Sequence, residues 1–168
     1  MASRGSCELL FIPKLLKADV SAATPEVPHS FDRNWEVWNR EFERFEVGPE
    51  TILVGHSTGA GFIVKYLSIH QDLKVAKVVL VAPWLDPDRE QTKDFFDDFE
   101  IDADLVKRTA GTTVFYSDDD EAGVLKTIKI LRDKVTDLEL REFHKYGHFC
   151  IGDMKTVEFP ELREEALS

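Results

Sequence analysis

The stretch TILVGHSTGAG (51–61) decides the fold, because it joins a buried strand to a helix through a turn of small residues. Its first four residues form a short apolar, β-branched run, which is typical of a strand covered on both faces. Residues 59–70 continue as a largely apolar helix, which predicts packing against a sheet. Between them, Gly55 and Gly59 flank Ser57 in a G-x-S-x-G pattern that leaves room for one hydroxyl to project above the sheet.

Strands and helices alternate along the rest of the chain, which predicts an α/β fold with a mostly parallel sheet and helices on both faces, a Rossmann-like three-layer arrangement. We expect a single domain over 7–168, with 1–6 a tag or a disordered start and 84–110 a small cap-like insertion. Further strands are predicted at 75–83, 112–117 and 138–143. Helices are predicted at 31–47, 89–99, 102–109, 124–135 and 156–167. The first of these helices is expected to be capped by Asn34 and ended by Gly48-Pro49, and the last to be interrupted near Pro160.

Composition excludes several classes of function. The 168 residues carry a formal net charge of −11, and no Lys/Arg cluster relieves it locally, so we expect neither nucleic acid nor an anionic membrane as a partner. No apolar run approaches the roughly 18 residues that a membrane span needs. The only two cysteines, Cys7 and Cys150, do not make a disulfide scaffold, and we expect a cytoplasmic protein. The histidines are scattered without metal-binding spacing, so no metal is predicted, and no cofactor is required.

Three loops follow predicted strands and carry, in chain order, a serine, aspartates and a histidine. Because the carboxyl ends of parallel strands meet at one end of a sheet, these loops are expected to lie together. A serine hydroxyl needs a base, and the base needs an orienting carboxylate. Ser57 is the predicted nucleophile, His148 the base, and Asp119 or Asp120 the acid. The backbone N–H of Thr58, at the start of the helix, could stabilise an oxyanion.

Other candidates near these loops are assigned to packing. His56 is expected to lie beside the site as a neighbour in the turn, without acting as a second base. His144 falls at the end of the last strand and is interpreted as structural. Cys150, two residues after His148, has the wrong context for a nucleophile.

These motifs resemble the small α/β-hydrolase-fold serine hydrolases typified by retinoblastoma-binding protein 9 and YdeN-type bacterial hydrolases. The resemblance runs from about residue 19 to the C-terminus. It implies Ser57 as nucleophile, Asp120 as acid and His148 as base, because the second aspartate of the family's DD pair is the acid. It also implies esterase-like or aminopeptidase-like cleavage of a small ester or amide. The matching pieces are VP-x(6)-W (27–35), ILVGHSTGA (52–60), VVLVAP (78–83), YSDDDE (116–121) and YGHF (146–149).

Two features depart from the family pattern. The family opens with a strand and a glycine-rich turn that supplies the second oxyanion donor, yet this chain has no glycine between Gly5 and Gly48. Either LLFIP (9–13) is a remnant of that strand, or KLLKA (14–18) ends the helix after it. In both cases half of the oxyanion hole is missing, which makes a weak or inactive pseudo-hydrolase, acting as an interaction protein, the alternative function.

The second departure concerns partners. The L-x-C-x-E stretch linked to binding of the retinoblastoma protein falls at FEVGP (45–49), where its Leu, Cys and Glu are absent, so that partner is not predicted. The oligomeric state is left open. The aromatic residues of the cap-like segment could line an apolar pocket for the acyl group or simply pack the cap onto the core. These pocket candidates are Trp84, Leu85, Phe95, Phe96 and Phe99.

Overall fold

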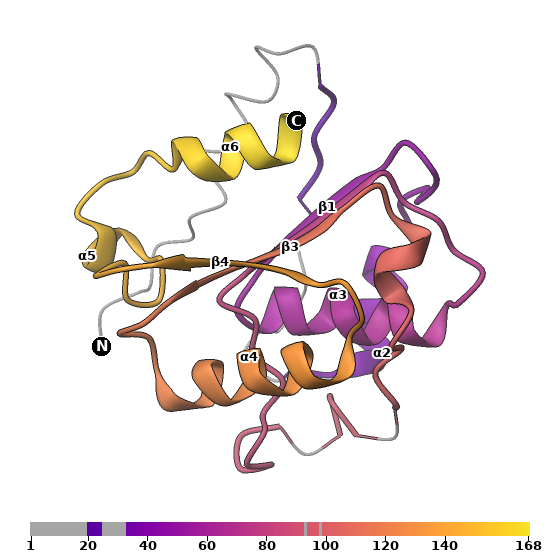
Figure 1. The fold of residues 1–168 in the computed structure, drawn as a ribbon. Helices are drawn as coiled ribbons and strands as arrows, with labels where there is room; N and C mark the ends of the chain where they lie inside the picture. The colour runs from indigo at the N-terminus through magenta and orange to yellow at the C-terminus, as the bar shows by residue number, and fades with distance from the viewer. Residues whose placement is uncertain (1–19, 25–32, 93, 98) are drawn as a thin grey trace.

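Four parallel strands form the sheet that carries the candidate site. The computed structural model describes residues 20–24, 33–92, 94–97 and 99–168. Each pair of neighbouring strands is parallel, so their carboxyl ends lie at the same end of the sheet (Figure 1). The strands are β1 (Ile52–His56), β2 (Lys77–Val81), β3 (Thr112–Ser117) and β4 (Glu139–Phe143), in the spatial order β1-β2-β3-β4.

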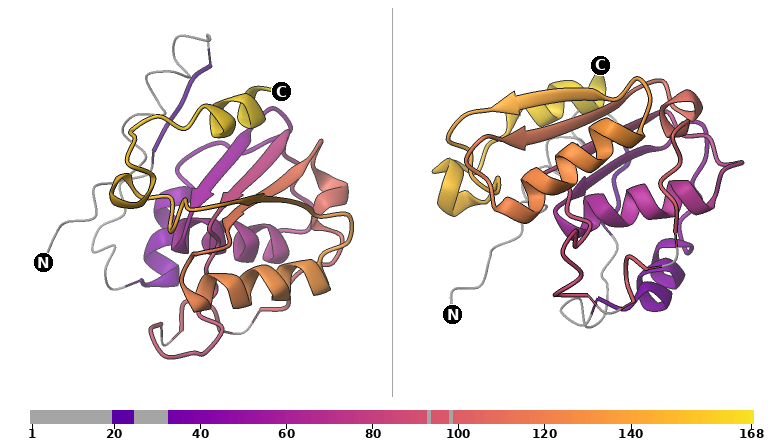
Figure 2. Two further views of the ribbon diagram at one scale, coloured as in Figure 1. Left: turned by 60° about the vertical axis from the view of Figure 1, so that its left-hand side comes forward. Right: turned by 60° about the horizontal axis from the view of Figure 1, so that its bottom comes forward.

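Helices cover both faces of the sheet, as predicted. α3 (Thr58–Ile69) and α4 (Ala122–Lys134) lie on one face, and α6 (Pro160–Leu167) lies on the other (Figures 1 and 2). Nearly every residue of α3 is buried, which explains why its sequence is apolar on all sides. α4 buries a single stripe, as its amphipathic sequence predicts.

α2 (Trp35–Phe42) packs on α3 through aromatic rings. The Asn34 side chain caps it by accepting a hydrogen bond from the Val37 N–H at 3.0 Å, as predicted. The ring of Phe42 lies 4.8 Å from that of Tyr66, centroid to centroid. Residues 31–32 of the predicted helix 31–47 lie outside the described residues, and the observed helix ends at Phe42, before the predicted end. The acidic residues that follow oppose the negative end of the helix dipole, which disfavours continuation.

The cap-like segment 84–110 is mostly irregular. Of the two helices predicted there, only a short 3₁₀ helix, η2 (Leu105–Arg108), forms within the described residues, so the prediction at 89–99 is wrong. The buried ammonium of Lys65 donates hydrogen bonds to the backbone carbonyls of Phe95 and Asp97, both at 2.9 Å. Carbonyls engaged in this way favour an extended loop over a helix.

The chain after β4 also differs from its prediction. The loop contains a short helix, α5 (Ile151–Met154), and α6 begins at Pro160 instead of being interrupted there. Proline lacks the backbone N–H that a first helical position does not use, so it starts this helix.

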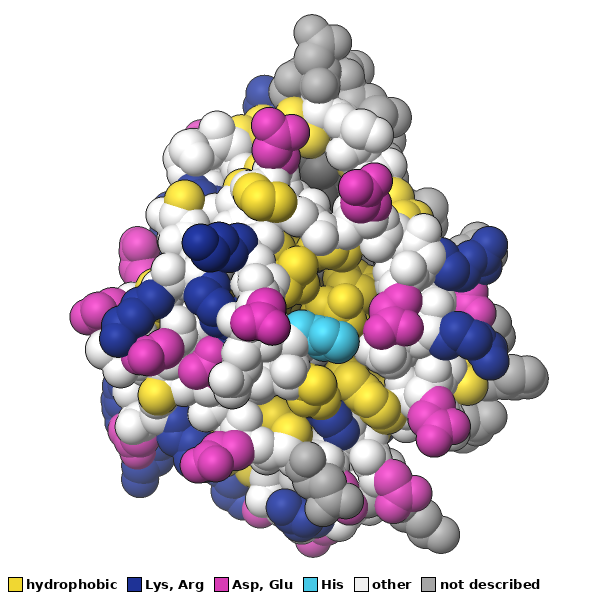
Figure 3. All heavy atoms as spheres, turned by 90° about the vertical axis from the view of Figure 1, so that its right-hand side faces the viewer, with side chains coloured by type: hydrophobic (Ala, Val, Ile, Leu, Met, Phe, Trp, Pro, Cys, Tyr) yellow, Lys and Arg dark blue, Asp and Glu magenta, His cyan; other side chains and the backbone are white. Residues whose placement is uncertain are grey.

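β1 forms one edge of the described sheet, and its Val54 side chain is partly exposed. The predicted remnant of a first strand, at 9–13, lies outside the described residues, as does Cys7. None of the described helices combines the length and the apolar character that crossing a bilayer requires. On the face shown in Figure 3, acidic and basic side chains are interspersed around a hydrophobic area.

Candidate active site

Ser57 lies in a sharp turn between β1 and α3. Its backbone has φ 56° and ψ −122°, a conformation that a non-glycine residue adopts only under constraint. The constraint comes from backbone hydrogen bonds on both sides of the peptide. The Ser57 N–H donates to the Val81 carbonyl at 2.9 Å, and its carbonyl accepts from the N–H groups of Gly61 and Trp84 at 3.1 and 3.2 Å. The predicted turn is therefore present and anchored to β2.

The glycines of this turn serve different purposes. A Cβ on Gly55 would lie 2.7 Å from the backbone nitrogen of Ala60, so this position requires glycine. A Cβ on Gly59 would meet no atom of the described residues within 4 Å, so among these residues the predicted steric need at Gly59 is wrong. Gly61 also requires glycine, which the sequence analysis did not predict, because a Cβ added there would lie 2.1 Å from the Trp84 carbonyl oxygen. Its signal in the sequence was the run of small residues 59–61, in which Gly61 lies two positions after the end of the motif.

A continuous line of hydrogen bonds joins the three predicted residues. His148 Nε2 lies 2.9 Å from Ser57 Oγ, and His148 Nδ1 lies 2.9 Å from Asp120 Oδ1. A carboxylate only accepts hydrogen bonds, so Nδ1 carries the hydrogen. Nε2 is then left to accept the hydrogen of the Ser57 hydroxyl. This is the arrangement in which an imidazole can take the serine proton.

Burial strengthens the contact between Asp120 and His148. The Asp120 side chain is fully buried, and that of His148 is 11% exposed. Oδ1 of Asp120 also accepts from the Glu121 N–H at 2.6 Å, whereas its buried Oδ2 has no hydrogen-bond partner in the described part of the chain. A buried carboxylate with one oxygen unsatisfied is expensive to desolvate, so the hydrogen bond from His148 matters more here than it would at the surface.

Asp119, the alternative acid, points elsewhere. Its Oδ1 accepts from the Ser117 hydroxyl at 2.6 Å and from the Gly147 N–H at 3.0 Å. The hydrogen bond from Ser117, followed by that from Gly147, holds the pKa of Asp119 below its ordinary value. Asp119 thus ties the loop after β3 to the loop that carries His148, while the contact with the His148 ring belongs to Asp120.

The loop that carries His148 has an unusual backbone. Lys145, Gly147 and Phe149 all have positive φ, at 64°, 51° and 55°. Phe149 anchors the loop, because its side chain is 1% exposed and its ring lies 5.5 Å from that of Phe143. The His148 N–H donates to Asp153 Oδ2 at 3.2 Å, a contact that the sequence analysis missed. No spacing rule connects Asp153 to this position, because α5 places it there.

Thr58 is the first residue of α3. Its backbone N–H follows Ser57 directly and has no hydrogen-bond partner among the described residues. An N–H at the start of a twelve-residue helix lies at the positive end of the helix dipole and favours a negatively charged oxygen. The segments 9–13 and 14–18, considered above as remnants of the family's first strand and helix, lie outside the described residues.

All five predicted pocket residues are buried or partly buried, but only some of them line a pocket. Phe95 is fully buried against Trp35 and Trp38, so it belongs to the core and not to a pocket. Trp84 is buried as well, with its ring against that of Phe96. A pocket does lie beside this segment, but its lining includes neither Ser57 nor His148. Of the predicted set, it is lined by Leu85, Phe96 and Phe99.

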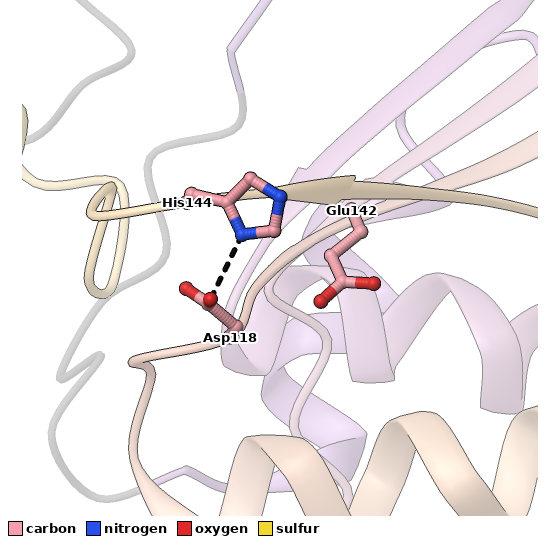
Figure 4. Close-up of side chains that lie close together, drawn as sticks. All are labelled: Asp118, Glu142 and His144. Carbon is pink, nitrogen blue, oxygen red and sulfur yellow. Dashed lines mark hydrogen bonds and ion pairs between the residues drawn. The ribbon is translucent and has the colours of Figure 1, made fainter.

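His144 contacts Asp118, and Cys150 contacts the backbone of His148. His144 Nδ1 lies 2.8 Å from Asp118 Oδ2, which raises the pKa of His144 through that hydrogen bond (Figure 4). The Cys150 thiol donates to the backbone carbonyl of His148 at 3.7 Å, not to its ring.

Asp118, Glu142 and His144 form a group whose ligand atoms lie within 4.8 Å of one another (Figure 4). Among the described residues, it is the group that offers three side-chain ligands to a metal ion. All three side chains are exposed, and such groups are common on surfaces without a metal. The sequence did not reveal the group, because pairing of β3 with β4 brings its members together.

Comparison with known proteins identifies the family. A family model described as "Serine hydrolase" matches residues 24–158. The ydeN gene product of B. subtilis has a similar structure, with a TM-score of 0.76 and 22% identity over 92% of this chain and 84% of that chain. Est1E from Butyrivibrio proteoclasticus, solved with bound ferulic acid, has a TM-score of 0.61 and 12% identity over 99% of this chain and 84% of that chain.

A bromoperoxidase from Bacillus anthracis has a TM-score of 0.60 and 13% identity over 96% of this chain and 85% of that chain. A search of curated proteins found no match. Identities this low establish the fold alone, whereas the family model covers most of the sequence. The chain therefore belongs to the serine hydrolase family and has an α/β-hydrolase-like fold.

Proposed function

We propose that the protein cleaves a small carboxylic ester or amide through an acyl-enzyme formed on Ser57. This proposal rests on two hydrogen bonds, one between Ser57 and His148 and one between His148 and Asp120, each 2.9 Å long. A serine hydroxyl becomes a nucleophile when a positioned imidazole removes its proton. The neighbouring Thr58 N–H supplies one donor for the oxyanion.

The reaction proceeds in two halves. Ser57 Oγ attacks the carbonyl carbon as His148 Nε2 takes its proton, and Asp120 stabilises the imidazolium that forms. His148 then gives the proton to the leaving alcohol or amine as the bond to the leaving group breaks. In the second half, water loses a proton to His148 and attacks the acyl group. The carboxylic acid leaves, and the proton returns to Ser57 Oγ.

Covalent labelling tests the proposal. A fluorophosphonate probe is expected to label the wild-type protein and to leave Ser57→Ala unlabelled, because the probe reacts with an activated serine. A protein unlabelled in both forms would contradict the proposal and support the alternative, a non-catalytic interaction protein. Intact mass should show one probe adduct, and peptide mapping should place it on Ser57.

Matched substrates separate ester from amide cleavage. p-Nitrophenyl acetate and an aminoacyl p-nitroanilide release chromophores that are simple to follow, but the amide has the poorer leaving group. Hydrolysis of the ester alone indicates a carboxylesterase-like enzyme, and hydrolysis of the anilide indicates a peptidase-like enzyme. Ser57→Ala serves as the blank for both substrates.

A further inference from the structure

We propose that His56 is a positioning residue, whose imidazole holds the backbone of His148 so that the His148 ring stays aligned with the Ser57 hydroxyl. This inference rests on the proposed function and adds a residue to the machinery that supports it. His56 fills the variable position of the G-x-S-x-G pattern, where the motif itself demands no particular side chain.

The contact is direct. His56 Nε2 lies 2.8 Å from the backbone carbonyl oxygen of His148. A carbonyl oxygen only accepts hydrogen bonds, so His56 Nε2 carries the hydrogen and donates. The two imidazole rings also touch, with centroids 4.8 Å apart and planes inclined by 51°. His56 therefore meets both the backbone and the ring of His148.

Two consecutive residues thus contact the same histidine at different points. Ser57 meets the His148 side chain at Nε2, and His56 meets the His148 backbone at its carbonyl. The two contacts close a ring through the single peptide bond between His56 and Ser57. Within such a ring, the nucleophile and the base cannot drift apart without breaking one of the hydrogen bonds.

The remaining anchors of this loop come from other elements. The Gly147 N–H is held by Asp119, which follows β3, and the His148 N–H is held by Asp153 in α5. These contacts fix the loop relative to β3 and to α5. The contact from His56 ties the loop to β1, the strand that carries the nucleophile.

The loop needs this restraint because its backbone is strained. The non-glycine residues Lys145 and Phe149 both adopt positive φ, which the surrounding contacts must enforce. Loss of the hydrogen bond from His56 would let the His148 carbonyl, and with it the ring, move. A misplacement of about 1 Å at a reacting pair can lower the rate about 100-fold.

Two substitutions of His56 separate the effect of its hydrogen-bond donation from the effect of its side-chain bulk. His56→Gln keeps an amide N–H that can reach the carbonyl, whereas His56→Leu keeps similar bulk and cannot donate. We expect His56→Leu to lower kcat for p-nitrophenyl acetate, and the rate of fluorophosphonate labelling, roughly 10- to 100-fold, with KM changed less than about twofold. His56→Gln should recover most of that loss. His70→Leu, at the far end of α3, is the matched control and should match wild type.

A second measurement does not depend on activity. The proton between His148 Nδ1 and Asp120 should give a low-field proton resonance in wild type and in His56→Gln, and this resonance should broaden or vanish in His56→Leu. If wild type is not labelled by the probe, the proposed function fails, and the resonance still decides the role of His56.

The inference is overturned if His56→Leu retains both the wild-type kcat and the wild-type resonance, or if His56→Gln is as impaired as His56→Leu. Circular dichroism checks that each variant folds. Should His56→Leu not fold, His56→Asn takes its place, because its shorter amide does not reach the carbonyl, and the same two outcomes apply.

Discussion

Single residues make different contacts at this site, even where two neighbours are of the same residue type. Asp120 and Asp119 are adjacent, yet the first meets the His148 ring and the second meets Ser117 and the Gly147 backbone. Both contacts join the loop after β3 to the loop that carries His148, but Asp120 meets a ring and Asp119 meets a backbone N–H. Roles within such a pair can be separated by substitution.

Asp120→Asn should lower kcat for ester hydrolysis about 10³- to 10⁴-fold, because the amide loses the charge that stabilises the imidazolium and favours the wrong tautomer of His148. Asp119→Asn should cost less than about tenfold, because its amide oxygen can still accept both hydrogen bonds. Steady-state kinetics on the two variants provide the measurement. A larger loss in Asp119→Asn than in Asp120→Asn would show that Asp119, not Asp120, acts as the acid.

The glycines around Ser57 make a second pair. Gly55→Ala should destabilise the fold by about 1–3 kcal/mol, because its Cβ would lie 2.7 Å from Ala60 N and from Ile63 Cδ1. Gly59→Ala meets nothing within 4 Å and should be neutral or stabilising by up to about 1 kcal/mol, since alanine favours helix. Urea unfolding measures both changes. A Gly59→Ala variant less stable than Gly55→Ala would contradict this reading of the turn.

At the scale of elements, the segment 84–110 shows how one side chain can accept the backbone hydrogen bonds that a helix would otherwise use. The Asp86 carboxylate is buried and accepts hydrogen bonds from the N–H groups of residues 90, 91 and 92 and from the Thr92 hydroxyl. Satisfied in this way, the backbone does not need helical hydrogen bonds. The sequence of this irregular segment was compatible with a helix at 89–99, and it does not reveal such competition from a side chain.

Asp86 should make stability depend on pH. Burial raises its pKa, but the hydrogen bonds from Thr92, Gln91 and Glu90 outweigh it, so the pKa lies below the ordinary 3.8. A lowered native pKa stabilises the fold above the unfolded value, and this stability is lost as pH falls below about 3.8 toward the native value. Wild type should exceed Asp86→Asn by about 1.5–3 kcal/mol at pH 7.

Urea unfolding of both proteins from pH 7 to pH 2.5 tests this expectation. The difference between them should be constant down to about pH 4 and should shrink below it. A difference that grows on acidification would mean that Asp86 is not held as a carboxylate in the folded protein.

At the scale of the whole molecule, the sheet brings the loops of the site together, and the net charge determines the electric field around them. All four strands run parallel, so loops separated by up to 91 residues in the chain meet at one end of the sheet. The net charge of −11 surrounds that arrangement with a negative field. Neutral or cationic small molecules are better suited to approach such a surface than polyanions are.

The protein should therefore bind neither DNA nor anionic membranes. In about 0.15 M salt, we expect no gel shift of a short DNA duplex and no co-sedimentation with vesicles rich in phosphatidylserine, because electrostatic attraction dominates both interactions. A shift that weakens as salt is raised would reveal a basic surface that the overall charge conceals.

The sequence by itself determined the alternating strands and helices, the turn at Ser57, and the chain order of Ser57, Asp120 and His148. These features depend on local patterns: hydrophobic period, small residues and the order of polar loops. The residue pattern left Asp119 and Asp120 open, and the family resemblance implied Asp120, which is the carboxylate that contacts His148. Only the tertiary structure decided that Gly61 needs to be small and that His56 contacts the His148 carbonyl. Those facts depend on how strands and loops distant in the chain are placed against one another, and no local pattern carries that information.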